Sequence, residues 1–500
     1  MPYADLVPDL LPRPTSLVRR EGMFRLRPES GVQAAPALVD LVRELLGPAT
    51  GYAFPPGPDL VFTPVDDPAL GAEGYRLSVT PDRVEATGTQ AGLRWAVQTL
   101  RQLLPDEIFG TAPVSGTPWE IPCVEIEDVP RYPWRGSLLD VARWCHPIGF
   151  LHRFVDLMAL HKLNTLHLHL TDDQGWRFEV RKYPRLTEVG GWRRESSAGL
   201  YREGRFDGAP HGGFYTQDEL RDLVAYAARR GVRIMPEIDV PGHMQAAIAA
   251  YPRLGNNPDT QLEVRTRWGI SAHILNAAEE TVSFVTDVLD ELVDVFPFGY
   301  VHLGGDEVPP DEWRASPAAQ ERARQVGLSD VDGLLGWWAA RLAEHLAGHG
   351  RRAAFWDEVL DGEAPPGSLI FGWRDESRVA AARAAGHEVV AVPEPYMYLD
   401  WAEVDSPDEP LAIKAAIPLD RVYGYQPGEV AGVQGQLWSE YLPTPELIEW
   451  RAYPRLAAVA EVGWTDPRPR DFTEFRGRLA AHLARLDTFE VNYRPLDPTV

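Results

Sequence analysis

The sequence has few cysteines, no long apolar run and too little positive charge for several classes of protein. Its two cysteines, Cys123 and Cys145, show neither metal-binding nor redox spacing, so we expect free thiols. No stretch approaches the roughly 18 apolar residues of a membrane span, and we expect no membrane partner. The 49 basic residues against 73 acidic ones give a formal net charge of −24, which argues against nucleic acid as a partner.

The amino-terminal residues MPYADLVPDLLPRPTS lack the basic start and apolar run of a secretory signal, and they favour a cytoplasmic protein. What is present is a globular composition, with 44% hydrophobic and 24% charged residues. The 16 tryptophans are many for this length. Tryptophans pack in cores, and sugar-binding sites also use flat aromatic faces, so their number alone does not separate the two roles.

A segment rich in proline and glycine, residues 105–122, divides the chain. Residues 1–125 read as a small α/β domain, and residues 126–500 as a second, larger one. In the first domain, helical spacing covers residues 37–47 and 91–104, and strand-like patterns cover residues 59–65 and 75–88.

In the second domain, apolar strands alternate with helical segments. The expected strands are residues 136–142, 165–170, 233–239, 300–307, 353–358, 368–373, 388–393 and 432–440. Eight strands with intervening helices predict a (β/α)₈ TIM barrel. A doubly wound sheet is the alternative, but no glycine-rich phosphate fingerprint follows the first strand. Residues 359–367, between the fifth and sixth strands, are too short and too broken for a good helix.

Acidic residues follow five of these strands, in the stretches TDDQGWR, EIDVPGH, GGDE, WDE and LWSE. A single aspartate after a strand is usually a helix cap or turn former. Five such ends, with tryptophan close by in several, indicate a cup lined by carboxylates and aromatic walls. Catalytic residues of barrels of this kind lie at the carboxyl ends of the strands.

The cup could bind a metal or act on a sugar. His167 and His169 share one face of a buried strand and are expected to be packed core histidines. We therefore expect no metal and no cofactor. Acids with aromatic platforms favour glycoside chemistry, in which a carboxyl group of raised pKa protonates the leaving oxygen.

The motifs WRGSLLDVAR, HLTDDQGWR, PEIDVPGH, HLGGDE and GQLWSEY resemble those of the family 20 glycoside hydrolases, the β-N-acetylhexosaminidases. The resemblance covers essentially the whole chain. It implies an exo-acting, retaining enzyme that removes terminal GlcNAc or GalNAc from glycans or chito-oligosaccharides. In this family the substrate's own acetamido oxygen attacks the anomeric carbon and forms an oxazolinium ion.

The resemblance also implies roles for individual residues. Glu307 would be the general acid and base, and Asp306 would orient the acetamido group and stabilise its developing positive charge. The residues implied to bind the sugar are Arg135 and Glu440 for ring hydroxyls, Trp356, Trp373 and Trp438 as aromatic walls, and Tyr398 and Asp400 for the acetamido oxygen and a hydroxyl. Those implied to set the protonation and orientation of the acid pair are Asp172, Asp239, His243 and His302, although a purely structural Asp–His contact would look the same in sequence.

One motif departs from the family pattern. Many relatives read Arg-His-Phe after the first strand, whereas this chain reads ARWCHP, so Trp144 and Cys145 are expected to alter the edge of the pocket. Three alternative functions stay open: a narrower relative that releases a disaccharide or a sulfated sugar, a non-catalytic carbohydrate-binding barrel, and a metal-dependent hydrolase. The oligomeric state is not indicated by the sequence.

Overall fold

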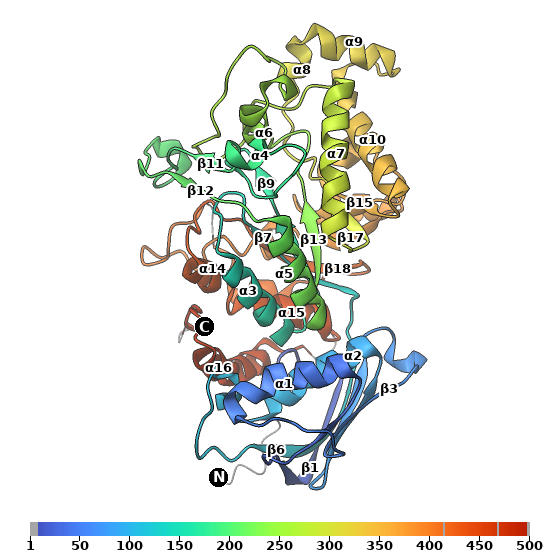
Figure 1. Ribbon diagram of the computed structural model, residues 1–500, viewed down its shortest axis with the longest axis vertical. Helices are drawn as coiled ribbons and strands as arrows, with labels where there is room; N and C mark the ends of the chain where they lie inside the picture. The colour runs from blue at the N-terminus through green and yellow to red at the C-terminus, as the bar shows by residue number, and fades with distance from the viewer. Residues whose placement is uncertain (1–8, 414–415, 468–469, 498–500) are drawn as a thin grey trace.

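A closed barrel of parallel strands forms the centre of the larger domain, which confirms the predicted (β/α)₈ architecture (Figure 1). The computed structural model describes residues 9–413, 416–467 and 470–497. Each predicted barrel strand is present, with its ends shifted by a few residues. The strands, in chain order, are β7 (Trp134–Asp140), β8 (Thr165–His169), β13 (Arg233–Glu237), β14 (Tyr300–His302), β15 (Arg352–Trp356), β16 (Leu369–Gly372), β17 (Glu388–Ala391) and β18 (Gly432–Leu437).

Helices cover the outside of the barrel (Figure 1). The longer ones are α3 (Ile148–Leu160), α5 (Gln217–Arg229), α7 (Glu279–Val295), α9 (Pro317–Gln325), α10 (Leu334–Gly348), α11 (Glu376–Ala384), α14 (Pro445–Ala452), α15 (Arg455–Trp464) and α16 (Phe472–Thr488). The shorter ones are α4 (Arg185–Glu188), α6 (Gln245–Ala250), α8 (Asp311–Ala315), α12 (Glu394–Met397) and α13 (Leu419–Gly424). Between β15 and β16 the chain forms only a 3₁₀ turn, Asp357–Asp361, as the broken pattern there predicts. Within the described residues, no helix has both the length and the apolar character needed to cross a membrane.

The inside of the barrel is polar as well as apolar. His167 and His169 of β8 are fully buried, which confirms that they are core histidines. Gln434 of β18 donates a hydrogen bond from Nε2 to Nδ1 of His167 over 3.1 Å, across the barrel interior. The alternate residues of β8, Leu166 and Leu168, belong to the hydrophobic core, because successive strand residues point to opposite faces.

The amino-terminal domain is a six-stranded sheet in the order β1-β6-β4-β5-β3-β2. Its elements are β1 (Ser16–Arg25), β2 (Val32–Gln33), α1 (Pro36–Thr50), β3 (Leu60–Pro64), β4 (Tyr75–Val79), β5 (Val84–Gly88), α2 (Gln90–Leu103) and β6 (Glu120–Asp128). Helices α1 and α2 lie on the face of the sheet that is turned to the barrel (Figure 1). Strand β6 runs a little beyond the predicted boundary at residue 125, and the barrel begins at Trp134.

Buried ion pairs join this domain to the amino-terminal end of the barrel strands. Arg135, the second residue of β7, contacts Glu73 with 2.7 Å between Nη2 and Oε2, and its side chain is fully buried. Lys162 contacts Asp128 over 2.7 Å. The prediction that Arg135 binds sugar hydroxyls is therefore wrong, because Arg135 lies at the opposite end of its strand from the acidic cup.

Candidate active site

The polar residues of the predicted cup lie where the barrel strands end. Because all eight strands are parallel, their carboxyl ends meet at one end of the barrel. The residues at or just after these ends are Asp140 (β7), Asp172 (β8), Asp239 (β13), Asp306 and Glu307 (β14), Trp356 and Glu358 (β15), Trp373 (β16), Tyr398 and Asp400 (β17), and Trp438 and Glu440 (β18).

An unusual turn presents the two neighbouring acids of the GGDE motif. Gly304 and Gly305 have φ angles of 65° and 90°, and Glu307 itself has a φ of 49°, in the left-handed region that side chains rarely adopt. Gly305 donates its backbone N–H to Oδ1 of Asp239 over 3.0 Å, which holds the turn. Strain of this kind persists where the surroundings impose it, and it is concentrated at functional sites.

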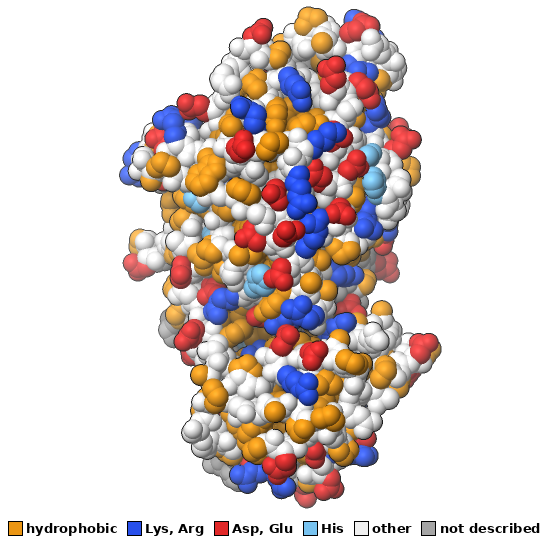
Figure 2. Space-filling model, viewed as in Figure 1, with side chains coloured by type: hydrophobic (Ala, Val, Ile, Leu, Met, Phe, Trp, Pro, Cys, Tyr) orange, Lys and Arg blue, Asp and Glu red, His pale blue; other side chains and the backbone are white. Residues whose placement is uncertain are grey.

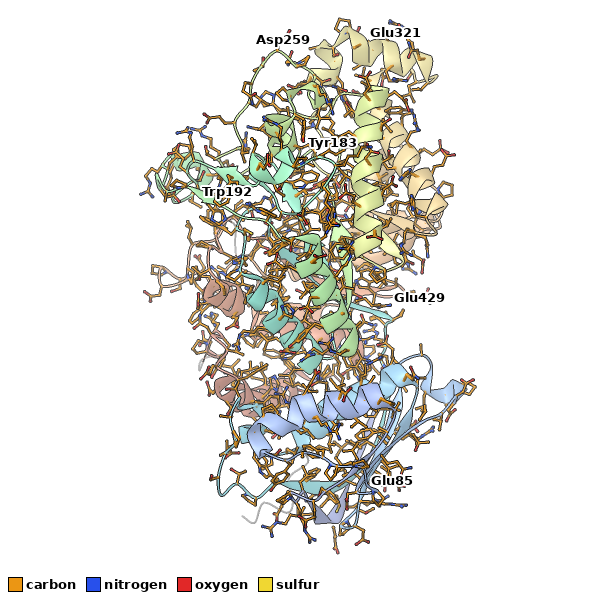
Figure 3. The ribbon with its side chains drawn as sticks, in the orientation of Figure 1. Glu85, Tyr183, Trp192, Asp259, Glu321 and Glu429 are labelled. Carbon is orange, nitrogen blue, oxygen red and sulfur yellow. The ribbon has the colours of Figure 1, made fainter. Side chains whose placement is uncertain are left out.

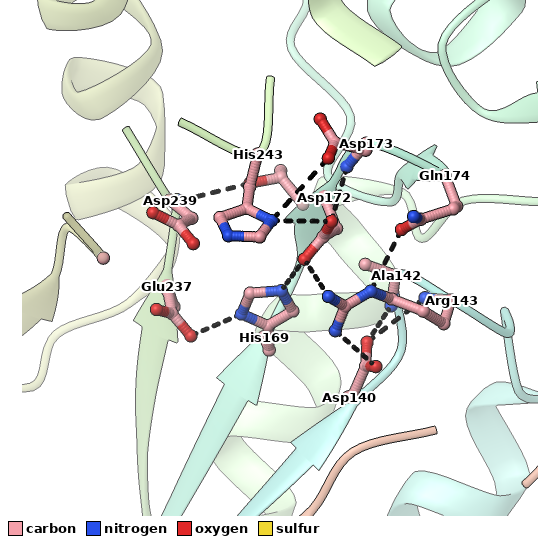
Figure 4. A network of polar contacts seen from close by, with 12 residues as sticks. Asp140, Ala142, Arg143, His169, Asp172, Asp173, Gln174, Glu237, Asp239 and His243 are labelled. Atoms are coloured by element: carbon pink, nitrogen blue, oxygen red, sulfur yellow. Dashed lines mark hydrogen bonds and ion pairs between the residues drawn. The ribbon is translucent and has the colours of Figure 1, made fainter. Parts of the chain in front are cut away.

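The turn directs both acids to one imidazole. Nε2 of His243 lies 3.7 Å from Oδ2 of Asp306 and 3.6 Å from Oε2 of Glu307. The other ring nitrogen, Nδ1, lies 3.1 Å from Oδ1 of Asp172. Burial by itself lowers the pKa of His243, but Asp172, Asp239 and Asp306 together raise that pKa well above its usual value. A positively charged imidazole therefore stands between Asp172 and the acid pair, and Figure 4 shows its contact with Asp172.

Burial affects the protonation of the acids as well. Burial first, and the nearby Asp239 second, raise the pKa of Asp306 well above its usual range, and His243 opposes the shift. Burial raises the pKa of Asp239 to about 7. Asp306 and Asp239 therefore compete to be ionised beside the same cation, which is the arrangement that shifts carboxyl pKa values at catalytic sites.

Beneath the acid pair, Glu237 is the centre of a buried cluster. Its carboxylate lies 2.5 Å from His169, 3.0 Å from His167 and 2.8 Å from His302, and all four side chains are fully buried. Trp356 donates its indole N–H to the same carboxylate over 2.9 Å. Burial alone would raise the pKa of Glu237, but the three imidazoles hold that pKa well below its usual range. Glu237 thus anchors His302 and the Trp356 wall together.

A second cation of the site is Arg143, three residues beyond the end of β7. Its guanidinium contacts Asp140 over 3.0 Å, Asp172 over 2.8 Å and, more distantly, Glu440 over 3.9 Å. His169 contacts Asp172 from the other side, with 2.9 Å between Nε2 and Oδ2 (Figure 4). Although burial opposes it, Arg143 and His243 keep the pKa of Asp172 well below its usual value. Arg143 therefore occupies the position that we had expected for Arg135.

Aromatic side chains pack against one another at the same end of the barrel. Trp356 lies beside Trp438 with 5.8 Å between ring centroids, and Trp373 stacks on Tyr398 with 6.1 Å between centroids. Trp373 donates its indole N–H to Glu358 over 3.0 Å. Burial first, and Asp306 second, raise the pKa of Glu358 to about 8.

Several buried polar atoms of this end of the barrel have no hydrogen-bond partner in the protein. They include Oδ2 of Asp239, Nε2 of His243, Oδ1 of Asp306 and Oδ1 of Asp400. Buried polar groups are normally hydrogen-bonded, so four unpartnered atoms at one end of a barrel mark a place where a polar ligand binds. Burial first, and Glu440 second, also raise the pKa of Asp400 well above its usual range.

Trp144, the residue that departs from the family motif, forms part of the rim. It donates its indole N–H to the backbone carbonyl of Glu440 over 3.2 Å. Its ring packs against Trp268 at 5.8 Å between centroids, and the Arg193 guanidinium lies 4.8 Å from it. Trp192, which precedes Arg193 in the short strand β11 (Trp192–Arg193), is exposed (Figure 3).

A family model described as "Glycosyl hydrolase family 20, catalytic domain" matches residues 132–467, and one for "domain 2" of the same family matches residues 7–129. The chain belongs to glycosyl hydrolase family 20. It is 40% identical to a β-hexosaminidase of Porphyromonas gingivalis over 85% of this chain and 55% of that relative. It is 38% identical to a β-hexosaminidase of Akkermansia muciniphila over 83% of this chain and 84% of the relative.

Among solved structures, the family 20 exo-β-N-acetylglucosaminidase of Vibrio harveyi, in complex with N-acetylglucosamine, is similar with a TM-score of 0.88. The sequence identity is 33%, and the match covers 98% of this chain and 78% of that one. This family 20 chain thus spans about half the length of the Porphyromonas relative and most of the Akkermansia and Vibrio proteins.

The structure of this family 20 chain also adds residues that sequence reasoning missed. Arg143 follows the carboxyl end of β7, so the same strand-end rule that selected the acids could have selected it. Glu237 stood in the noted EIDVPGH stretch, but its contacts with histidines of two other strands depend on the closed barrel. Glu358 stood in the noted WDE stretch, but its proximity to Asp306 depends on the closed barrel.

Proposed function

We propose that this chain is an exo-acting, retaining β-N-acetylhexosaminidase that removes terminal GlcNAc or GalNAc by substrate-assisted catalysis. The observation that carries the proposal is the pair Asp306 and Glu307, which face the one imidazole of His243 from a strained turn. The names of the similar β-hexosaminidases and the N-acetylglucosamine bound to the Vibrio harveyi enzyme support this choice of substrate.

In the first step of the proposed reaction, the enzyme supplies an anion rather than a nucleophile. Neighbouring residues that face one imidazole are poorly disposed to straddle a sugar, as the two carboxyl groups of ordinary retaining glycosidases do. In the proposed reaction the acetamido oxygen of the substrate attacks its own anomeric carbon. Oδ1 of Asp306, which has no partner in the protein, accepts the acetamido N–H and offsets the positive charge of the oxazolinium ion.

Glu307 supplies the proton in this scheme. With 36% of its side chain exposed, against 13% for Asp306, it lies on the more open side, where a leaving sugar departs. It protonates the glycosidic oxygen and then, as a carboxylate, removes a proton from the water that opens the oxazolinium ion. His243, held by Asp172, orients both acids and compensates their charge as the proton moves.

The remaining groups would hold the terminal sugar. The guanidinium fork of Arg143 and the carboxylates of Asp400 and Glu440 suit vicinal hydroxyl groups, which donate to carboxylates and accept from guanidinium. The aromatic walls suit the apolar face of the ring and the acetamido methyl group. Trp144, hydrogen-bonded to the Glu440 backbone, closes this side of the cup and so favours exo action.

Hydrolysis of aryl β-GlcNAc, β-GalNAc and β-glucoside, with and without a thiazoline mimic of the cyclic intermediate, tests the proposal. We expect rapid cleavage of the first, strong inhibition by the thiazoline and almost no cleavage of the glucoside. Brisk glucoside cleavage would point to an enzymic nucleophile. Sugar binding without hydrolysis would favour a carbohydrate-binding barrel, and loss of hydrolysis with a chelator would favour a metal-dependent hydrolase.

A further inference from the structure

Far from the acidic cup, three side chains that can ligate a metal converge on the outer surface of the barrel. Asp290 lies on α7, His345 lies on α10, and His349 caps the carboxyl end of α10. The Nε2 atoms of His345 and His349 lie 2.7 Å and 2.9 Å from the same oxygen, Oδ1 of Asp290. One ligand atom from each residue lies within 4.8 Å of the others.

Helix geometry explains the convergence. Residues four apart on a helix share a face, and the rings of His345 and His349 have centroids 5.0 Å apart. Helix α7 runs beside α10 and brings Asp290 to them (Figure 1). Figure 2 shows histidine side chains on the surface over these helices, next to acidic ones. The expectation of no metal overlooked this pair, and its third partner is 55 residues away in sequence.

We propose that Asp290, His345 and His349 form a binding site for a divalent transition-metal ion of the Zn²⁺ class. Two imidazole nitrogens and one carboxylate oxygen are donors that zinc prefers, whereas Ca²⁺ and Mg²⁺ need mostly oxygen. Tetrahedral bonds of about 2.0–2.2 Å put donor atoms about 3.3–3.6 Å apart, so from 2.7 Å and 2.9 Å the side chains need to open by less than about 1 Å. Their exposed fractions of 26–48% leave room for the ion and a water as fourth ligand.

The surroundings of the cluster favour a bound cation over two simple His–Asp hydrogen bonds. Both imidazoles approach one carboxylate oxygen, although the carboxylate has two oxygens to offer. The cluster lies at the carboxyl end of α10, where the last backbone carbonyls carry partial negative charge, on a protein of net charge −24. Binding requires the lone pair of each Nε2 atom, and the proton of each neutral imidazole then resides on Nδ1.

The proposed metal site joins two helices and is separate from the catalytic end of the barrel. Helix α10 leads into β15 at Arg352, so its carboxyl end lies at the amino-terminal end of the barrel strands, opposite to Asp306 and Glu307. A bound ion cross-links α7 to α10 and stabilises the folded barrel, because it binds the folded state preferentially. It takes no part in hydrolysis.

Calorimetric titration of the full chain with ZnCl₂ tests the site, using His345→Ala and His349→Ala. The matched control is His152→Ala, because His152 of α3 forms a single His–Asp pair with Asp222 of α5 over 3.3 Å. We expect one zinc-binding event in the wild type and in the control, and binding at least about tenfold weaker in the two test variants. Zinc should raise the melting temperature of the wild type and of the control only.

Activity separates this site from the buried acid and histidine groups of the active site. Hydrolysis by His345→Ala should equal that of the wild type, with or without a chelator. Zinc binding that persists unchanged in both test variants, or that is absent from the wild type, overturns the proposal. So does a zinc event in His345→Ala that abolishes hydrolysis, because the ion would then sit among the catalytic carboxylates.

Discussion

The carboxylate of Asp239 fills the space that a side chain at Gly304 would need. A Cβ atom placed on Gly304 would lie 1.7 Å from Oδ1 of Asp239, and the same oxygen accepts the N–H of Gly305. The end of β13 therefore determines the backbone path after β14. That path places Asp306 and Glu307 next to the same imidazole, that of His243.

Gly304→Ala should accordingly lower kcat/KM for an aryl β-GlcNAc substrate by orders of magnitude, because Asp239 or the turn must move. The left-handed backbone adds a cost of about 1–3 kcal/mol to the folded state. Gly477→Ala is the control: Gly477 lies within α16, has no neighbour near its Cβ position and should be neutral or slightly stabilising. Wild-type turnover in Gly304→Ala would contradict the close packing seen here.

Glu307→Gln should lower turnover of substrates with poor leaving groups by about 10²–10⁴-fold, since it removes the proposed proton donor. Good leaving groups need little protonation and should lose less. A series of aryl β-GlcNAc substrates of graded leaving-group pKa measures this slope. Equal losses along the series would be incompatible with an acid role for Glu307.

Asp306→Asn should cost about 2.7–4 kcal/mol of transition-state stabilisation, which is about 10²–10³-fold in kcat, by analogy with other preorganised charge-stabilising groups. The loss should appear with every leaving group, because it concerns the charge of the proposed oxazolinium ion. Steady-state kinetics on the same aryl series measures it. If turnover stays near normal, Asp306 does not bear the counter-charge.

Arg143→Lys keeps the positive charge among Asp140, Asp172 and Glu440 but loses the two-pronged guanidinium. We expect a higher KM and a lower kcat/KM. Arg135→Lys is the counterpart at the other end of β7: it should lower the melting temperature by weakening the contact with Glu73 and leave KM unchanged. The opposite pattern, with KM sensitive to Arg135, would restore the role first predicted from sequence.

Glu358 should make the protein less stable as pH rises. Its pKa is about 8 in the folded state against an ordinary 4.5, so the folded state binds its proton more tightly than the unfolded state does. Between pH 4.5 and pH 8 the unfolded chain has lost this proton while the folded chain still holds it. The free energy of unfolding therefore falls by about 1.4 kcal/mol per unit of pKa shift as the pH rises through this range. In Glu358→Gln, which retains an acceptor for Trp373, urea unfolding at pH 5 and pH 8 should show a smaller fall.

Glu429→Gln is the matched control for this pH dependence. Glu429 is 95% exposed and lies at the surface (Figure 3), so its substitution should leave the wild-type fall unchanged. If Glu358→Gln loses as much stability as the wild type between the two pH values, burial beside Asp306 does not control the titration of Glu358.

Local patterns were enough to predict the architecture and the strand-end acids. Apolar segments of strand length, separated by amphipathic helices, predicted all the barrel strands. A strand that is buried on both faces is a short, mostly apolar run, and such a run can be recognised from the local sequence. Asp306 and Glu307 followed from their place directly after one such strand. The wrong prediction for Arg135 shows the limit of this reasoning. Arg135 lies at the start of β7 and Arg143 lies just beyond its end, so only the direction of the strand shows which arginine faces the cup.

The sequence by itself therefore determined the order of the strands and which acids follow them, since both depend on residues that are near neighbours in the chain. Only the tertiary structure decided which groups meet across the barrel. Glu237 with its three histidines, Glu358 beside Asp306, and Asp290 with His345 and His349 each join distant segments. Their charges and pKa values depend on burial and on distances of a few ångströms, which a linear pattern does not contain.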